Sequence, residues 1–254
     1  MQEALYQVRG LVKRYGRRTV LDRIDFDVSR GESLVILGRS GSGKSVTLRQ
    51  LNGLDKPDAG TVIFDGQTIS DMEERELFAV RRRIGMLFQG GALFDSMTVF
   101  NNVAFPLREH SGLEEEEIAE KVKQQLQMVK LRGVEQKMPA DLSGGMKKRV
   151  ALARSLALEP EVMLFDEPTT GLDPMTSATI GKLIRGIQQQ LGVTAVVVTH
   201  DLHLGRAVGD RVGFLSRGRF AFLGGWEEAD GTRHPEFAAF LAGREEDEED
   251  EDAA

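Results

Sequence analysis

Short apolar runs separated by polar or glycine-rich segments are the main pattern along this chain of 254 residues. Ser33 to Leu37, Val162 to Phe165 and Thr194 to Val198 are almost continuously apolar, which is typical of strands in a parallel sheet covered on both faces. A helical stretch from about Thr176 to Leu191 separates the last two strands. Because parallel strands need crossover connections of this kind, the pattern predicts an α/β fold.

The chain around the first buried strand adds shorter elements. Leu5 to Val12 and Val20 to Val28 are β-rich segments joined through Lys-Arg-Tyr-Gly, and they predict two short strands. Thr61 to Phe64 and Ile84 to Phe88 are expected to be further strands, and Lys44 to Leu51 a helix after a glycine-rich loop. These elements begin the expected α/β core.

Residues 89–158 are mostly helical and interrupt the alternation of strands and helices. Glu114 to Val129 places its apolar side chains on one helical face, and Ser143 can cap a later helix that ends at Glu159-Pro160. After about Ser216 we expect a short strand pair and a helix beyond Pro235. The predicted organisation is a single domain over 5–241, with a core at about 5–88 and 159–241 and an inserted helical subdomain at about 89–158.

The composition limits the class of protein. Hydrophobic residues make up 41% of the chain, enough for a substantial core. No apolar run approaches the roughly 18 residues that a membrane-spanning helix needs. The N-terminal sequence lacks the apolar core of a signal peptide. The absence of cysteine excludes disulfides, thiol catalysis and cysteine-ligated metals. We therefore expect any membrane contact to be made through a partner.

The net charge of −7 comes from one end of the chain. Glu245 to Asp252 holds eight of the 40 acidic residues, so the rest carries 33 basic and 32 acidic residues and is nearly neutral. A terminal block of like charge is typical of a disordered, solvating extension, which we predict for residues 242–254, with docking or regulation as the alternative role. Neither part has the basic excess of a nucleic-acid-binding protein.

A glycine-rich loop after the first buried strand matches the phosphate-binding pattern G-x-x-x-x-G-K-[ST]. Its glycines let successive backbone N–H groups point at phosphate oxygens, and the following helix N-terminus adds partial positive charge. Lys44 is expected to neutralise the β- and γ-phosphates, and the Ser45 hydroxyl to bind Mg²⁺. The predicted nucleotide-binding residues of this loop and helix are Gly38, Arg39, Ser40, Gly41, Ser42, Gly43, Lys44, Ser45 and Val46.

Two carboxylates, Asp166 and Glu167, follow the apolar strand at Val162 to Phe165. Open α/β sheets present ligand-binding groups at the carboxyl ends of their strands. A buried aspartate is costly without a partner, and Mg²⁺ would remove that cost for Asp166, directly or through water. Glu167 is placed to accept a proton from the attacking water or to orient it. Helix capping is the alternative role, which the apolar strand before the pair disfavours.

A second glycine-rich turn, Leu142-Ser143-Gly144-Gly145, opens a second helix shortly before these carboxylates. A turn of this kind implies a second phosphate contact. The combination resembles the signature of ATP-binding-cassette (ABC) ATPases over about residues 5–241. The resemblance implies a P-loop NTPase fold with a RecA-like core, an N-terminal antiparallel β-subdomain and an inserted helical subdomain. It also implies that the chain binds ATP with Mg²⁺ and hydrolyses it to ADP and phosphate.

The resemblance implies roles for residues that their own pattern leaves open. Tyr15, otherwise a packing residue of a hairpin, corresponds to the aromatic residue that stacks on adenine. Gln89, otherwise a polar residue at a strand end, corresponds to the glutamine that contacts Mg²⁺ and the attacking water. His200, at another strand end, corresponds to the histidine that contacts the γ-phosphate. The remaining histidines match no such position and are expected to be ordinary surface or packing residues: His110, His203 and His234.

Ser143, Gly144 and Gly145 lie about a hundred residues beyond a loop that already holds the phosphates. In ABC ATPases two subunits pair head to tail, and this motif of one subunit closes over the ATP of the other. The resemblance therefore implies a homodimer, with Asp173 in a loop that crosses the interface. Met146 stands where many relatives have glutamine, which replaces an amide contact with an apolar one, and we assign it no binding role.

Residues 86–110 closely resemble the ATPases of MCE-associated lipid transporters, the Mla and Mkl group. That group implies an ATPase subunit that drives phospholipid transport between the inner and outer membranes. It also implies a peripheral position on the cytoplasmic face of the inner membrane, with two integral-membrane permease subunits and a periplasmic MCE-type lipid-binding subunit. Thr169 to Asp173 departs from this group, because Mla ATPases often carry a glutamine before the aspartate.

Beside Gln89, ABC ATPases receive a short coupling helix of the permease in a groove. Leu93, Phe94 and Phe100 are expected either to line this groove or to pack in the core of the helical subdomain. Two other functions remain open. The core motifs equally permit the ATPase of a polar-solute importer, for example of amino acids, or a single-cassette ABC module without a transport role.

Overall fold

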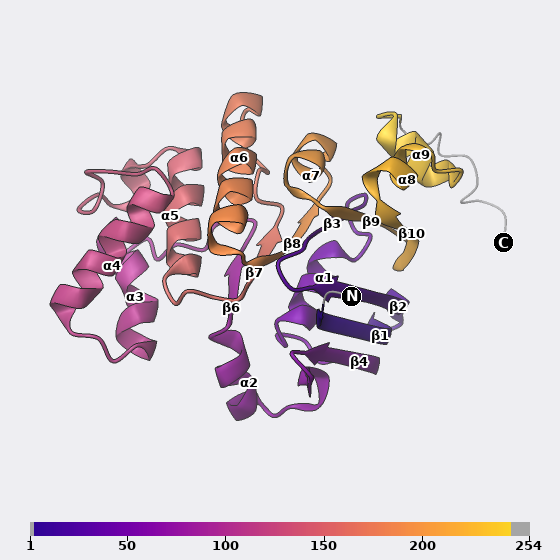
Figure 1. Ribbon diagram of the computed structural model, residues 1–254, viewed down its shortest axis with the longest axis horizontal. Helices are drawn as coiled ribbons and strands as arrows, with labels where there is room; N and C mark the ends of the chain where they lie inside the picture. Colours follow the sequence, from indigo (N-terminus) through magenta and orange to yellow (C-terminus); the bar gives the residue numbers. More distant parts are fainter. Residues whose placement is uncertain (1–2, 245–254) are drawn as a thin grey trace.

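The computed structural model describes residues 3–244, so the acidic block at 245–252 lies outside the described residues. Two sheets dominate this part of the chain (Figure 1). The larger contains, in spatial order, β10 (Arg219–Gly225), β9 (Arg211–Ser216), β3 (Ser33–Leu37), β8 (Thr194–Thr199), β7 (Val162–Asp166) and β6 (Ile84–Leu87). The smaller contains β2 (Arg18–Ser29), β1 (Ala4–Tyr15), β4 (Ala59–Phe64) and β5 (Gln67–Thr68).

The larger sheet is parallel from β9 to β6, and only β10 runs antiparallel to its neighbour. Its central strands are buried on both faces. In β3, Val35 and Leu37 belong to one apolar core, whereas Leu34 and Ile36 belong to another. The smaller sheet is antiparallel throughout. The predicted α/β fold with an N-terminal antiparallel sheet is confirmed.

Helices cover the two faces of the larger sheet. Apolar residues of α6 (Pro174–Leu191) and α7 (Leu202–Val208) pack in the core that contains Val35. Leu48 and Leu51 of α1 (Lys44–Leu51) pack with Leu34 on the opposite face, together with the smaller sheet. Among the described residues, every helix is too short or too polar to cross a membrane.

Three helices lie together beyond β6, at one end of the molecule (Figure 1). They are α3 (Val99–His110), α4 (Glu115–Met128) and α5 (Gly144–Leu156), and their buried residues share one apolar core. Ser143 caps α5, since its hydroxyl accepts a hydrogen bond from the backbone N–H of Met146 at 3.3 Å. This group falls within the segment where the sequence predicts helices, although α5 ends three residues earlier than expected.

The short elements differ most from the sequence prediction. For α9 (Pro235–Leu241) the sequence pattern predicts only the start. It predicts none of the following short elements: α2 (Glu74–Arg81), α7, α8 (Trp226–Asp230), and the 3-10 turns Ile69–Asp71 and Pro139–Asp141. The final strand pair begins at Arg211, so the expected start near Ser216 was wrong. A helix of seven or eight residues has barely two turns of periodicity, and capping by Asp201 rather than a long apolar stripe marks the start of α7.

Candidate nucleotide-binding site

The glycine-rich loop connects the buried end of β3 to the first turn of α1. Gly43, at the N-cap of α1, has a φ of 108°, a backbone conformation that residues other than glycine rarely adopt. A Cβ there would lie 2.7 Å from Cδ2 of Leu21, and one at Gly38 would collide with the carbonyl oxygen of Leu215. The loop therefore keeps its path only with glycine at these two positions.

Lys44 lies at the centre of this loop. Its Nζ donates hydrogen bonds to the carbonyl oxygens of Gly38 at 2.8 Å and Arg39 at 3.0 Å, and lies 3.3 Å from Oε1 of Glu167. The side chain is buried. Among the described residues, the buried hydroxyl of Ser42 has no hydrogen-bond partner. A buried ammonium beside an unpaired donor suits an anionic ligand at the helix N-terminus.

Ser45 and Asp166 meet although they are 121 residues apart. The Ser45 hydroxyl donates to Oδ1 of Asp166 at 2.7 Å, which joins α1 to the carboxyl end of β7. Burial raises the pKa of Asp166 above its usual value. Hydroxyl and carboxylate oxygens are ligands that Mg²⁺ prefers, and phosphates and water normally supply the others. In the described part of the chain no group of three or more His, Cys, Asp or Glu side chains forms a metal site. The oxygens of Ser45 and Asp166 fit an ion whose other ligands are phosphate and water.

Glu167 is held by groups at the end of β8 and by Lys44 of α1. Its Oε2 accepts hydrogen bonds from the Thr199 hydroxyl at 3.2 Å and the His200 backbone N–H at 3.3 Å, and lies 2.8 Å from Nδ1 of His200. Its φ of 46° is left-handed, which is costly for a residue with a side chain. The Glu167 N–H donates to the carbonyl oxygen of Val198 at 3.0 Å and helps to hold this conformation.

One pocket of about 650 Å³ collects most of the residues singled out in the sequence. Tyr15 lies at its edge, 46% exposed, and its hydroxyl donates to Oδ2 of Asp55 at 2.5 Å. Predicted residues that line this pocket are Tyr15, Arg39, Ser40, Gly41, Gly43, Lys44, Ser45, Val46, Gln89, Glu167 and His200. Residues that the sequence analysis did not find are Arg18, Val20 and Phe240. Phe240 comes from α9, almost 200 residues beyond the loop, and no sequence signal connects the two.

Lys148 is a further residue that sequence reasoning missed. It lies on α5, is buried, and its Nζ donates to the carbonyl oxygen of Gln89. Burial lowers the pKa of this ammonium, while the charges of Asp166 and Glu167 oppose the shift. The helix that begins at the second glycine-rich turn thus holds the loop that carries Gln89.

The second glycine-rich turn lies elsewhere. Ser143, Gly144 and Gly145 do not line the pocket that contains Lys44. Instead, a Cβ at Gly145 would lie 2.6 Å from Cγ2 of Thr176 at the start of α6. Asp173 caps this helix, with Oδ1 accepting from the Thr176 N–H at 3.0 Å. Within the described part of one chain, the pocket therefore contains no group from the second turn.

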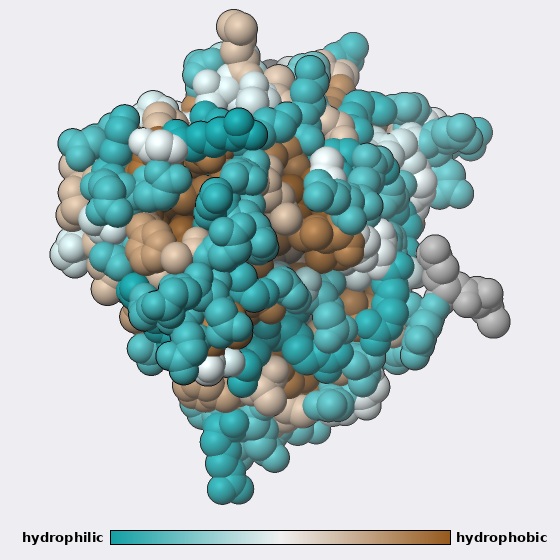
Figure 2. Space-filling model, turned by 60° about the vertical axis from the view of Figure 1, so that its left-hand side comes forward, coloured by the Kyte–Doolittle hydropathy of each residue, from teal (hydrophilic) through white to brown (hydrophobic). Residues whose placement is uncertain are grey.

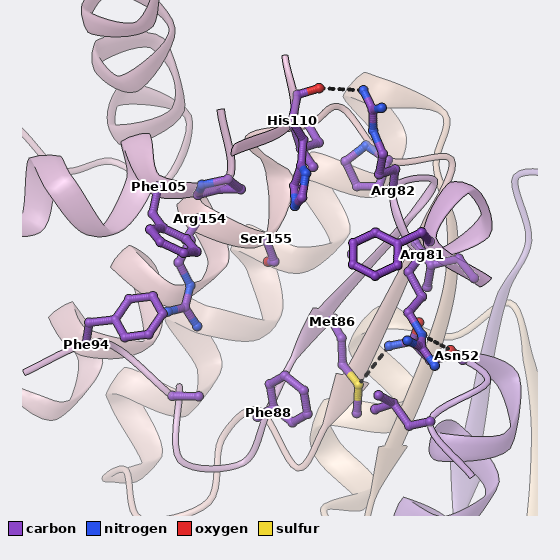
Figure 3. A pocket seen from close by; sticks show the side chains of 18 residues that line it. Asn52, Arg81, Arg82, Met86, Phe88, Phe94, Phe105, His110, Arg154 and Ser155 are labelled. Carbon is purple, nitrogen blue, oxygen red and sulfur yellow. Dashed lines mark hydrogen bonds between the residues drawn. The ribbon is translucent and has the colours of Figure 1, made fainter. Parts of the chain in front are cut away.

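A separate apolar groove of about 450 Å³ lies beside Gln89, on the side of the molecule where the three helices α3, α4 and α5 gather (Figures 2 and 3). Figure 2 shows apolar surface set among polar side chains on this side. Of the three residues expected here, only Phe94 lines the groove, while Leu93 and Phe100 pack against the core. His110 also lines it.

Fold and site together define a P-loop ATPase of the ABC type, and comparison with known proteins agrees. The ABC transporter family model matches residues 21–170, more than half of the chain. The chain belongs to this family and is an ATPase that binds ATP. ABC cassettes act as dimers with membrane permeases.

Several relatives are similar over most of their length. The probable ribonucleotide transport ATP-binding protein mkl of Mycobacterium leprae is 42% identical over 238 residues, covering 94% of this chain and 69% of that protein. The intermembrane phospholipid transport system ATP-binding protein MlaF is 44% identical in Haemophilus influenzae over 202 residues, with coverage of 80% and 76%. In Escherichia coli K12 it is 42% identical over 228 residues, with coverage of 90% and 85%.

Solved structures agree with this assignment. The dimeric post-hydrolysis structure of the ATP-binding cassette MJ0796 bound to ADP and Pi has a TM-score of 0.80 and 33% identity, covering 87% of this chain and 98% of that chain. The structure of cbiO1 of Clostridium perfringens, part of the ABC transporter complex cbiONQ, has a TM-score of 0.83 and 33% identity, covering 94% of this chain and 96% of that chain. Both are cassettes of the same fold.

Proposed function

We propose that this chain is the ATP-hydrolysing subunit of a transporter that moves phospholipid between the inner and outer membranes. The observation that supports this most is the 42–44% identity to MlaF proteins over 80–90% of the chain. The phosphate-binding loop and the carboxylates do not identify the class of transported substrate, because they serve ATP hydrolysis in every transporter of the family.

In the proposed mechanism, the phosphates of ATP lie on the loop from Gly38 to Ser45, and adenine stacks on Tyr15. Lys44 neutralises charge on the β- and γ-phosphates. Mg²⁺, held by Ser45, Asp166 and Gln89, supplies further neutralisation of phosphate charge when bound.

Glu167 orients the attacking water and accepts its proton. The water oxygen bonds to the γ-phosphorus as the bond to the bridging β–γ oxygen breaks, so ADP leaves with its terminal oxygen charged. His200 contacts the γ-phosphate, and its 2.8 Å contact with Glu167 places both groups at the same side of the pocket. Both residues follow adjacent strands of one sheet.

The pocket of one chain is completed by a second copy. Ser143, Gly144 and Gly145 of one subunit contact the ATP of the other, and Asp173 lies in the loop that crosses the interface. This arrangement explains why the second glycine-rich turn lies apart from Lys44 within one chain. Hydrolysis then depends on dimer closure.

The homodimer works at the cytoplasmic face of the inner membrane, beneath two permease subunits that act with a periplasmic MCE-type lipid-binding protein. The apolar groove beside Gln89 receives the coupling helix of the permease. Phe78, Phe88, Phe94 and Phe105 line it and are 37–58% exposed, an unusual number of exposed aromatic rings for a surface without a partner.

Purification of the native complex through a tag on this chain tests the proposal. We expect a permease, an MCE-family subunit and phospholipid, identified by mass spectrometry, together with ATP hydrolysis by the complex. A complex that hydrolyses ATP yet contains neither an MCE-family protein nor bound lipid would exclude phospholipid transport.

Transport of a polar solute is the second candidate, and one comparison favours it. The mkl proteins, 42% identical over 94% of the chain, are named for ribonucleotide transport. Stimulation of the complex's ATPase activity by ribonucleotide-class solutes, together with a soluble solute-binding protein in place of the MCE subunit, would support this function.

A further inference from the structure

The groove beside Gln89 is apolar but carries positive charge. Exposed phenylalanines form much of its wall, and none of its 18 lining residues is acidic. Three guanidinium groups line it, on Arg81, Arg82 and Arg154 (Figure 3). Arg81 pairs with Glu74. Among the described residues, neither Arg82 nor Arg154 has a carboxylate partner, so the groove presents two cations without counter-charges.

Arg154 has the more enclosed position of the two. Its Cζ lies 5.4 Å from the centroid of the Phe94 ring, which packs in turn against Phe105 with centroids 5.0 Å apart. Nη2 donates one hydrogen bond, to the carbonyl oxygen of Gly91 at 3.2 Å. Burial lowers the pKa of this guanidinium. The Arg154 guanidinium is thus partly desolvated, and among the described residues no carboxylate pairs with it.

An entirely apolar segment in the groove would cover Arg154 further and leave its charge unpaired, which is costly. A carboxylate would instead form a charge-assisted hydrogen bond with Arg154. Because the fold already encloses this guanidinium, pairing it costs less further desolvation. We propose that the segment occupying this groove is amphipathic, with apolar side chains against the phenylalanines and an aspartate or glutamate that pairs with Arg154. This inference rests on the proposed docking of a permease in the groove.

The position of Arg154 gives this pair a second consequence. Its hydrogen bond to Gly91 fixes the loop that carries Gln89, whose own carbonyl oxygen accepts from Lys148. Both cations lie on α5, so the loop between β6 and α3 is held to one helix at two points. A carboxylate that pairs with Arg154 therefore binds a side chain that also holds the loop carrying Gln89.

Photocrosslinking identifies the occupant without altering Arg154. In one variant p-benzoylphenylalanine replaces Phe78, which is 58% exposed at the groove, and in a second it replaces Phe105. Each variant of the chain is co-expressed with the native membrane complex. Mass spectrometry of the crosslinked peptide should reveal a permease segment with an acidic residue within one helical turn of the attachment point. A permease segment without such a residue would overturn the carboxylate pair while leaving permease docking intact. Absence of any permease crosslink at both positions would instead refute the proposed docking.

Substitution of Arg154 measures the pair itself. We expect Arg154→Gln to weaken retention of the permease by about 30-fold or more, because one partner of an enclosed ion pair is lost. Arg154→Lys, which keeps the charge, should recover part of that loss. Exposed Arg132, which does not line the groove, provides the matched control Arg132→Gln. Equal retention by Arg154→Gln and the control, at equal melting temperature, would contradict the proposal.

Discussion

The Glu167 carboxylate lies 2.8 Å from Nδ1 of His200, although 33 residues separate them in the sequence. The contact follows from the register of two parallel strands, in which Asp166 of β7 pairs with Val198 of β8. Each residue therefore reaches the pocket at the end of a buried strand. A reaction that needs a base and a phosphate-contacting histidine on one side of the nucleotide finds both at this sheet edge.

Glu167→Gln should abolish turnover while preserving ATP binding. The amide keeps the shape of the side chain but cannot take a proton from water, so kcat should fall by about 100-fold or more. ATP should then hold the dimer closed, which size-exclusion chromatography with and without ATP measures. Rapid hydrolysis by this variant, with phosphate release near the wild-type rate, would refute the role of Glu167.

Lys44→Ala should lose nucleotide affinity rather than only turnover. The ammonium is buried among the loop carbonyls and is the cation nearest the expected phosphates, so its removal should weaken ATP binding by roughly 10- to 100-fold. Titration with a fluorescent ATP analogue measures this. Lys123→Ala removes a lysine that is 60% exposed on α4 and should bind as tightly as wild type. Unchanged affinity of Lys44→Ala would exclude the assigned contact.

The sequence predicted the buried strands and the phosphate-binding loop, because their structure depends on residues that are close together in the chain. Buried strands such as β3 and β8 are runs of apolar residues, and the phosphate-binding loop from Gly38 to Ser45 follows a spacing of glycine, lysine and serine that is visible in the sequence. Phe240 and Lys148 could not be found in this way, because tertiary packing alone brings them to the pocket and to Gln89. The helix α2 was missed for a different reason: it has barely two turns of periodicity, and its N-cap is Glu73 rather than Ser, Thr, Asp or Asn.

Asn102→Ala should destabilise the protein by about 2–3 kcal/mol, since it leaves several buried polar groups unpaired. The fully buried Asn102 amide accepts from the Phe94 N–H at 2.8 Å and donates to three carbonyl oxygens of the loop from Phe94 to Thr98. Urea unfolding measures the free-energy difference. Asn101→Ala, which removes only a contact with Arg108, should cost much less. Similar losses for both variants would show that the loop does not depend on Asn102.

Arg83→Met should lower stability at neutral pH by about 1 kcal/mol, a small value because solvent screens these partly exposed charges. Arg83 pairs with Asp65 and, through Nε at 2.5 Å, with Glu161, and these hydrogen bonds hold the pKa of both carboxyls below their usual values.

A carboxyl with a depressed folded-state pKa stabilises the fold above its unfolded pKa, near 4, and loses that contribution as the pH falls through the folded value. The difference between wild type and Arg83→Met should therefore be fully present at pH 7 and shrink as the pH falls below about 4. Urea unfolding at pH 7 and at about pH 3 measures both values, with exposed Arg75→Met as the control. A difference that stays constant between the two pH values would assign the effect of Arg83 to its packing on the Phe64 ring, 4.7 Å from Cζ, rather than to the carboxylates.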